Sequence, residues 1–365
     1  MKILLTHGYF LEEDPKEMEI MKPYPTLGLL YISGYLNQKG VVHDVFDTTF
    51  SSTNEFKNHL LATQPEVIAF YTNLMTKVKV IELIQFIRSQ EQLQKIKVVL
   101  GGPDLTYNQK KYLNAGADFL VIGEGEETFY ELVEALRKEE STDQINGVSY
   151  MQEGELNVNA PRIKMKDLED LPLPNRSAYP IKKYLDTWKS YHGESALNIS
   201  TQRGCPYTCK WCSTAVYGQS YRRRSAKNVV AELKLLSKEY NPDTFWFVDD
   251  VFTISHKWLE EFHTEIIDSG IEIKFECITR AERMNDKVIK WLKESGCIRV
   301  WIGAESGSQK IIDAMDRRVD INKVKDMLIK TRLAGIQTGT FIMVGYPGET
   351  IEDIKTTAKY LEDAL

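Results

Sequence analysis

Cysteine is scarce in this sequence, and none of the five cysteines lies before position 205. So few thiols in a chain of 365 residues exclude a disulfide-stapled scaffold and favour a reducing compartment, the cytoplasm. No apolar run reaches the roughly 18 residues that a membrane-spanning helix needs, so we expect no span. Basic residues are not in excess either, since 46 Lys and Arg stand against 52 Asp and Glu, and we expect no nucleic-acid partner.

The first 140 residues alternate short apolar segments with helical patterns. Strands are expected at Val67–Tyr71 and Lys97–Leu100, for example, with a helix at Lys77–Gln90 between them. This alternation predicts an α/β fold with a doubly wound parallel sheet over residues 1–140. Ligands of such sheets bind at the carboxyl ends of the strands, where the glycine pair Gly101-Gly102 falls.

Residues 141–190 differ in pattern from both flanks. Ile145–Val158 is expected to form a small hairpin around Gly154. The prolines that follow favour a stiff, extended connector, with the domain boundary near residue 170.

A second α/β series occupies residues 191–365. Its first strand is expected at Leu197–Thr201, its fifth at Thr338–Val344, and a helix at Ile351–Leu365 ends the sequence. Strands alternating with helices in this way predict a (β/α)6-type barrel with functional residues just after each strand. Because a sixth strand is missing, we expect the barrel to be incomplete and truncated at its C-terminus.

Three cysteines are clustered after the first strand of this second series, in Cys205-Pro-Tyr-Thr-Cys209-Lys-Trp-Cys212. Tetrahedral structural zinc takes four nitrogen or sulfur ligands, and no fourth cysteine or histidine is near in the sequence. Three thiolates on one loop suit a 4Fe–4S cubane with one iron left open. Zinc with a distant fourth ligand and three incidental cysteines remain the alternatives.

The spacing CxxxCxxC, with Trp211 before the last cysteine, resembles the signature of the radical SAM superfamily. The resemblance implies that the open iron chelates S-adenosylmethionine (SAM), which is then cleaved reductively to a 5′-deoxyadenosyl radical. It also implies a small-molecule substrate and an electron donor such as flavodoxin or ferredoxin.

Further segments of residues 191–365 resemble the SAM-contacting segments of that superfamily. Phe247-Val-Asp-Asp250 stands where the family has Gly-Gly-Glu, Ile302–Gly307 resembles G-x-E-S-G, and Phe341–Glu349 resembles the glycine-rich segment after the fifth strand. An arginine after the third strand suits the SAM carboxylate, because guanidinium pairs bidentately with carboxylate. The candidate SAM contacts are Asp249, Asp250, Arg280, Glu305, Ser306 and Gly345.

The first 140 residues resemble the N-terminal domain of cobalamin-binding radical SAM enzymes, in Pro23–Leu30 and in the Gly-Glu-Gly-Glu turn at 123–126. The corrinoid pattern Asp-x-His-x-x-Gly falls at Asp47–Ser52, where Thr49 replaces the histidine, and Ser-x-Leu is matched loosely by Thr72-Asn-Leu74. The resemblance implies cobalamin held without histidine ligation. The candidate contacts are Asp47, Thr49, Thr72, Leu74, Gly101 and Gly102.

Two classes of function stay open at this point. The first is a radical SAM enzyme, with cobalamin, that methylates or rearranges a small molecule. The second is a non-catalytic cluster- or corrinoid-binding module. A tRNA methylthiotransferase-like enzyme is a further alternative, but such enzymes carry additional cysteines in the first domain, and residues 1–204 contain none.

Overall fold

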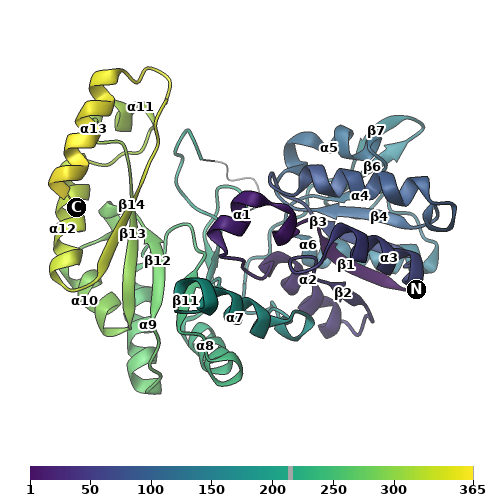
Figure 1. Cartoon of the computed structure of the whole chain (residues 1–365), viewed down its shortest axis with the longest axis horizontal. Helices are drawn as coiled ribbons and strands as arrows, with labels where there is room; N and C mark the ends of the chain where they lie inside the picture. The colour runs from purple at the N-terminus through teal and green to yellow at the C-terminus, as the bar shows by residue number, and fades with distance from the viewer. Residues whose placement is uncertain (213–216, 365) are drawn as a thin grey trace. The chain divides into compact units, whose positions relative to one another are not determined.

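The computed structural model describes residues 1–212 and 217–364, which form two compact units. Residues 1–166 and 170–193 belong to the first unit, and 167–169, 194–212 and 218–364 to the second. Figure 1 gives the elements of both units along the chain.

The first unit is built on a seven-stranded sheet in the order β2-β1-β3-β4-β5-β6-β7. The first five strands in this order pair in parallel, and the predicted hairpin adds β6 and β7 antiparallel. The order reverses direction between β1 and β3, and ligands of doubly wound sheets bind at such a switch point. The strands are β1 (Ile3–His7), β2 (Asp44–Phe46), β3 (Val67–Tyr71), β4 (Lys97–Gly101), β5 (Phe119–Val121), β6 (Val148–Gln152) and β7 (Glu155–Val158).

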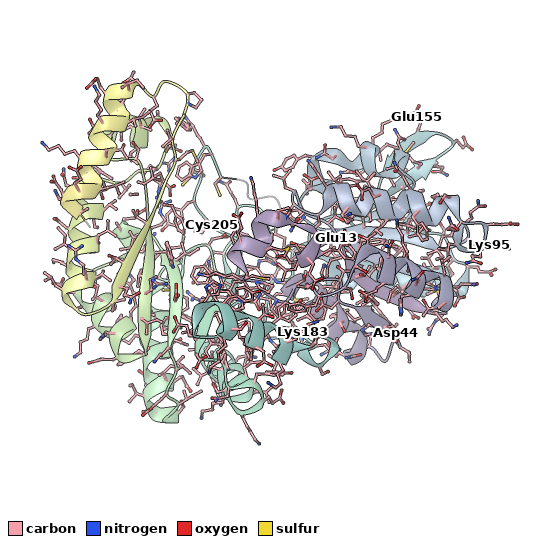
Figure 2. The ribbon with its side chains drawn as sticks, viewed as in Figure 1. Glu13, Asp44, Lys95, Glu155, Lys183 and Cys205 are labelled. Carbon is pink, nitrogen blue, oxygen red and sulfur yellow. The ribbon has the colours of Figure 1, made fainter. Side chains whose placement is uncertain are left out.

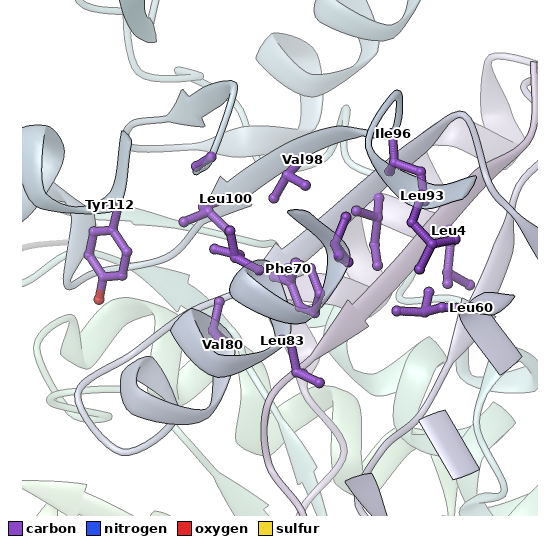
Figure 3. Packing of buried hydrophobic residues seen from close by; sticks show 14 of the residues in the cluster. Leu4, Leu60, Phe70, Val80, Leu83, Leu93, Ile96, Val98, Leu100 and Tyr112 are labelled. Carbon is purple, nitrogen blue, oxygen red and sulfur yellow. The ribbon is translucent and has the colours of Figure 1, made fainter. Parts of the chain in front are cut away.

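Helices cover this sheet because its strands are apolar on both faces. Figure 3 shows Leu4, Phe70 and Leu100 of the strands together with Val80 and Leu83 of a helix, all in one buried cluster. The helices are α1 (Pro15–Ile20), α2 (Leu27–Gln38), α3 (Thr53–Thr63), α4 (Lys77–Ser89), α5 (Leu105–Asn114), α6 (Gly125–Lys138) and α7 (Ile181–His192), with short 3-10 turns η1 (Leu11–Glu13), η2 (Glu91–Leu93) and η3 (Arg176–Ala178).

Helix α7 overlaps the end of the segment for which the sequence predicted an extended connector, and that prediction is wrong for residues 181–190. The prolines end at Pro180, and the helix begins directly after it. Its buried residues follow helical spacing, namely Ile181, Tyr184, Leu185 and Trp188. The apolar face therefore stabilises a helix within the first unit.

The second unit contains a five-stranded, all-parallel sheet in the order β14-β13-β12-β11-β8 and a separate two-stranded pairing of β9 with β10. The strands are β8 (Ala196–Ile199), β9 (Gln202–Arg203), β10 (Arg222–Arg223), β11 (Thr244–Phe247), β12 (Phe275–Thr279), β13 (Cys297–Glu305) and β14 (Gln337–Ile342). Within the described residues, β8 and β14 are the two edges of this sheet.

Helices connect the consecutive strands of this sheet, and in Figure 1 α12 and α13 run beside β13 and β14. The helices are α8 (Ala226–Tyr240), α9 (His256–Ser269), α10 (Asp286–Glu294), α11 (Gln309–Ala314), α12 (Ile321–Leu333) and α13 (Ile351–Ala364), with the 3-10 turn η4 (Ala281–Arg283). The predicted fold class, a doubly wound domain followed by a partial barrel of β/α units, is confirmed. In the described part of the chain, no helix is long and apolar enough to span a membrane.

Candidate functional site

The cysteine loop follows β8, and at its base β9 pairs antiparallel with β10. Gly204 directly precedes the first cysteine with a φ of +84°, and a Cβ there would lie 2.2 Å from the Ser220 hydroxyl oxygen. Glycine is therefore required at this position. Cys205, labelled in Figure 2, and Cys209 are partly buried, and Cys212 is exposed.

Asp249, just after β11, anchors the start of this loop. Its carboxylate accepts hydrogen bonds from the backbone amides of Thr201 at 2.8 Å and Gln202 at 3.1 Å, and from the Thr201 hydroxyl. The residue is 2% exposed, and the Arg223 guanidinium lies 3.6 Å from the carboxylate and compensates its charge. The structure thus gives Asp249 protein partners at the place where the sequence predicted a contact with SAM.

Asp250 has different surroundings from its neighbour. It is exposed, yet desolvation by nearby residues raises the pKa of its carboxyl, and the charge of Asp249 raises it further. Burial raises the pKa of the Cys205 and Cys212 thiols, and the charges of Asp250 and Cys209 add to both shifts. The three thiols and Asp250 therefore share one electrostatic environment.

Arg280 follows β12 and lies against the second cysteine. Its Nη1 donates a hydrogen bond to the Cys209 Sγ at 3.1 Å. A cavity of about 200 Å³ opens here, and its lining consists of Pro206, Tyr207, Thr208, Cys209, Arg280, Glu282, Asp316, Arg317 and Arg318. The structure therefore places Arg280 at the cysteine loop. Its Nη1 contacts the Cys209 sulfur, so this nitrogen is not free for the SAM carboxylate that the sequence predicted as its partner.

Glu305 ends β13, which runs past the strand predicted at Arg299–Ile302. A register shift against β14 and a φ of +67° place Glu305 in an unusual backbone conformation, of the kind that clusters at functional sites. Burial raises the pKa of its carboxyl, although the guanidinium of Arg317, 3.8 Å away, and that of Arg280 act in the opposite direction. Its charge also raises the pKa of the Cys212 thiol, so Glu305 belongs to the same environment.

Ser306 and Gly345 are placed differently from these residues. The Ser306 hydroxyl is fully buried, lies 3.1 Å from the Thr357 hydroxyl of α13 and accepts the Ser308 amide at 3.1 Å. Gly345 is exposed, has a φ of +87° and donates its amide to the Glu349 carboxylate at 2.5 Å. Among the hydrogen bonds of the described residues, neither reaches the cysteine loop.

The donor set on the loop fits a 4Fe–4S cluster. A cubane binds each thiolate at a different iron, so its ligands do not converge on one point. Among the described residues, no group of three or more His, Cys, Asp or Glu side chains is placed to hold a single metal ion. Three thiols on one loop, beside a buried arginine, would supply the cluster's ligands and part of the compensating charge.

Four of the residues predicted to contact cobalamin lie at the ends of β3 and β4. The Thr72 amide donates to the Gly101 carbonyl at 2.7 Å. Gly102 has a φ of +122°, and a Cβ there would lie 2.1 Å from the Thr72 carbonyl oxygen, so no larger residue fits. Leu74, which follows β3, is 69% exposed.

This edge of the sheet fits a large, partly apolar ligand. The Thr72 hydroxyl is buried and has no hydrogen-bond partner among the described residues, although buried polar groups are normally paired. Leu74, Met75 and Tyr107 expose apolar surface at the same strand ends. These residues would suit a corrinoid, which carries both apolar surface and hydrogen-bonding amide groups.

Asp47 and Thr49 lie after β2 and are engaged within the protein. The Asp47 carboxylate accepts hydrogen bonds from His7 Nε2 at 3.1 Å and from the Tyr184 hydroxyl at 2.9 Å. Because the Tyr9 amide donates to His7 Nδ1, Nε2 is the nitrogen that carries the proton. Burial acts to raise the pKa of Asp47, but the contacts with His7 and the hydrogen bonds from Thr49 together outweigh it, and the pKa is lowered.

The structure therefore separates the predicted cobalamin residues into two groups. Asp47 and Thr49 follow β2, whereas the others lie at the ends of β3 and β4. The Thr49 hydroxyl lies 2.7 Å from the Tyr184 hydroxyl oxygen, and Ser52, at the end of the corrinoid-like pattern, caps α3. Strand β1 lies between the strand that precedes Asp47 and the strand that precedes Thr72.

Sequence reasoning missed three residues of these environments: Tyr184, Tyr207 and Arg317. It made no claim for His7, which ends the buried strand β1, because a lone histidine is more often a satisfied polar group. Nothing in the local sequence around Arg317 marks it, because only the fold brings it to Glu305.

Comparison with known protein families matches both units. The model of the B12 binding domain matches residues 19–133, and the model of the radical SAM superfamily matches residues 199–361. The uncharacterized methyltransferase PH0819 of Pyrococcus horikoshii is 30% identical over 351 residues, which are 92% of this chain and 72% of that protein. The anaerobic magnesium-protoporphyrin IX monomethyl ester cyclase of Cereibacter sphaeroides is 26% identical, over 94% of this chain and 57% of the cyclase.

Among solved structures, the cobalamin-dependent SAM radical enzyme OxsB with aqua-cobalamin bound matches with a TM-score of 0.84. The match covers 100% of this chain and 52% of OxsB at 21% identity, so it shows a shared fold. The chain thus spans little more than half the length of OxsB and of the cyclase. With both domain models matched in order along the chain, the protein belongs to the radical SAM superfamily, in the subclass that carries a cobalamin-binding domain.

Proposed function

We propose that this protein cleaves SAM reductively at a 4Fe–4S cluster held by Cys205, Cys209 and Cys212, and acts on a small molecule with the help of cobalamin. The observation that carries the proposal is the position of three free cysteines on one loop whose base is fixed by the buried Asp249. That loop lies within the segment matched by the superfamily model.

The bound cofactors supply an electron and an open iron for cleaving SAM to a 5′-deoxyadenosyl radical, and a corrin that carries the methyl group. The protein residues hold and orient these groups. Asp250 and Glu305 are the carboxylates in the electrostatic environment of the thiols, and both suit the amino group and ribose hydroxyls of SAM. Ser306 and Gly345 shape the backbone turns that follow β13 and β14.

We assign cobalamin to the domain over residues 1–140, at the carboxyl ends of β1, β3 and β4. The unpaired Thr72 hydroxyl and the exposed Leu74 support this position. A methyltransferase and a cyclase are among the similar proteins, which supports either methylation or rearrangement of the substrate. For the electron donor we propose a flavodoxin or ferredoxin.

Anaerobic reconstitution with iron and sulfide, followed by SAM and dithionite, tests the proposal. We expect release of 5′-deoxyadenosine, measured by liquid chromatography, and its complete loss in Cys209→Ala. Cys297→Ala is the matched control, because Cys297 is buried in β13 and should leave the release unchanged. Release from Cys209→Ala equal to wild type would rule out the cluster assignment.

A further inference from the structure

Arg280 is held in place by protein contacts on all sides of its guanidinium. It is 5% exposed, and its Cζ lies 3.9 Å from the centroid of the Tyr207 ring. Nε donates to the Glu282 carboxylate, and Nη2 donates to the Arg317 carbonyl oxygen at 2.5 Å. The remaining nitrogen, Nη1, is thereby directed at the Cys209 Sγ at 3.1 Å.

We propose that Arg280 is a positioning residue that raises the reduction potential of the cluster through its hydrogen bond to Cys209. The inference rests on the proposed function, because it requires the cluster on Cys205, Cys209 and Cys212. It gives Arg280 a role toward a cluster sulfur in place of the contact with the SAM carboxylate expected from the sequence.

The physical reason is the change of charge on reduction. An added electron increases the negative charge on the cluster and its thiolates, so a donor N–H and a positive charge at 3.1 Å stabilise the reduced form more than the oxidised form. Because the Arg280 guanidinium is itself buried, solvent screens its charge less than it would at the surface.

The charged groups around Cys209 leave a positive balance on this side of the loop. Arg317 and Arg318 join Arg280 there, against the carboxylates of Glu282 and Asp316. Burial lowers the pKa of Arg317, and the nearby positive charge of Arg280 lowers it further. Within the described residues, Arg280 donates a hydrogen bond to the sulfur of Cys209 and to no other cysteine. This contact distinguishes Cys209 from Cys205 and Cys212.

Three variants separate this role from a purely structural one. Arg280→Gln removes the charge, Arg280→Lys keeps the charge but loses the fork that fixes the donor, and Arg283→Gln is the matched control. Arg283 donates to the Tyr207 hydroxyl, and its guanidinium lies 5.7 Å from that ring, but no hydrogen bond joins it to a cysteine among the described residues.

The measurement is a potentiometric titration of the reconstituted cluster, followed by the EPR signal of its reduced form. In Arg280→Gln we expect the reduction equilibrium to become about tenfold less favourable, which is about 59 mV for one electron. Arg280→Lys should shift in the same direction by less, and Arg283→Gln least of all. A fully loaded Arg280→Gln protein with the wild-type potential contradicts the inference.

Pulsed EPR on protein labelled with ¹⁵N-arginine covers the case in which Arg280→Gln fails to assemble a cluster. The wild-type reduced cluster should show hyperfine coupling to an arginine nitrogen, and Arg280→Lys should lose it. Absence of the coupling in wild type overturns the inference. A wild-type protein that binds no cluster at all contradicts the proposed function instead, so the two failures are distinguishable.

Discussion

At the scale of single residues, Asp249 and Asp250 show how adjacent carboxylates take opposite roles. The Asp249 carboxylate is buried with its hydrogen-bond and ion-pair partners around the loop base, whereas Asp250 is exposed and its charge acts on the thiols. Both residues follow β11, which ends at Phe247. Only the structure shows which of the two carboxylates is buried and which is exposed.

Replacing Asp249 with Asn should lower the free energy of unfolding and the iron content of the reconstituted protein. The change removes the counter-charge of the buried Arg223, and breaking a buried pair costs about 3 kcal/mol. Urea unfolding and iron content of the reconstituted protein measure both effects. Asp250→Asn is the control, which should keep stability and iron but weaken SAM binding. Equal iron content in Asp249→Asn and wild type would show that the loop does not depend on this carboxylate.

At the scale of elements, the sequence predicted the bounds of some segments fully and missed others. β3 (Val67–Tyr71) has the predicted bounds and α4 (Lys77–Ser89) ends one residue before the predicted Gln90, because an apolar run and an amphipathic pattern are local signals. Helix α7 was missed because the prolines before it dominate the local composition. The cysteine spacing is equally local and was readable, whereas the approach of Arg280 to Cys209 joins residues 71 positions apart.

The Tyr184 hydroxyl of helix α7 should contribute to the stability of the first unit. In Tyr184→Phe, the Asp47 carboxylate loses a hydrogen bond of 2.9 Å and the Thr49 hydroxyl loses its partner oxygen at 2.7 Å. A hydrogen bond to a charged group contributes about 2 kcal/mol, so thermal and urea unfolding should both move toward lower stability by about that amount. Tyr191→Phe on the same helix is the control, since Tyr191 is 59% exposed. Equal losses in the two variants would contradict the role of the network.

At the scale of the whole molecule, the chain carries two candidate cofactor sites, one built entirely within each unit. The cysteine loop takes its anchors from the second unit, through Asp249 and Arg223. The Thr72 and Gly102 edge is built from strands of the first unit. Because the contacts cited for each site lie within one unit, loading of the two cofactors should be separable by mutation.

Thr72→Val is the variant that should separate them. The isosteric change removes a buried, unpaired hydroxyl, so the protein without cobalamin should be stabilised by about 1 kcal/mol while retention of cobalamin falls. Thr331→Val is the matched control, because the Thr331 hydroxyl of α12 is also buried without a partner among the described residues. It should be stabilised to a similar extent and keep cobalamin.

The readouts are urea unfolding, the corrin absorbance that remains after incubation with hydroxocobalamin and desalting, and the release of 5′-deoxyadenosine. Thr72→Val should lose corrin absorbance but still cleave SAM, and Cys209→Ala should do the reverse. If Thr72→Val and Thr331→Val retain equal amounts of cobalamin, the hydroxyl at the end of β3 does not contact the corrinoid. If one mutation abolishes both signals, the two sites are coupled through the fold, and the separation drawn from their hydrogen bonds is wrong.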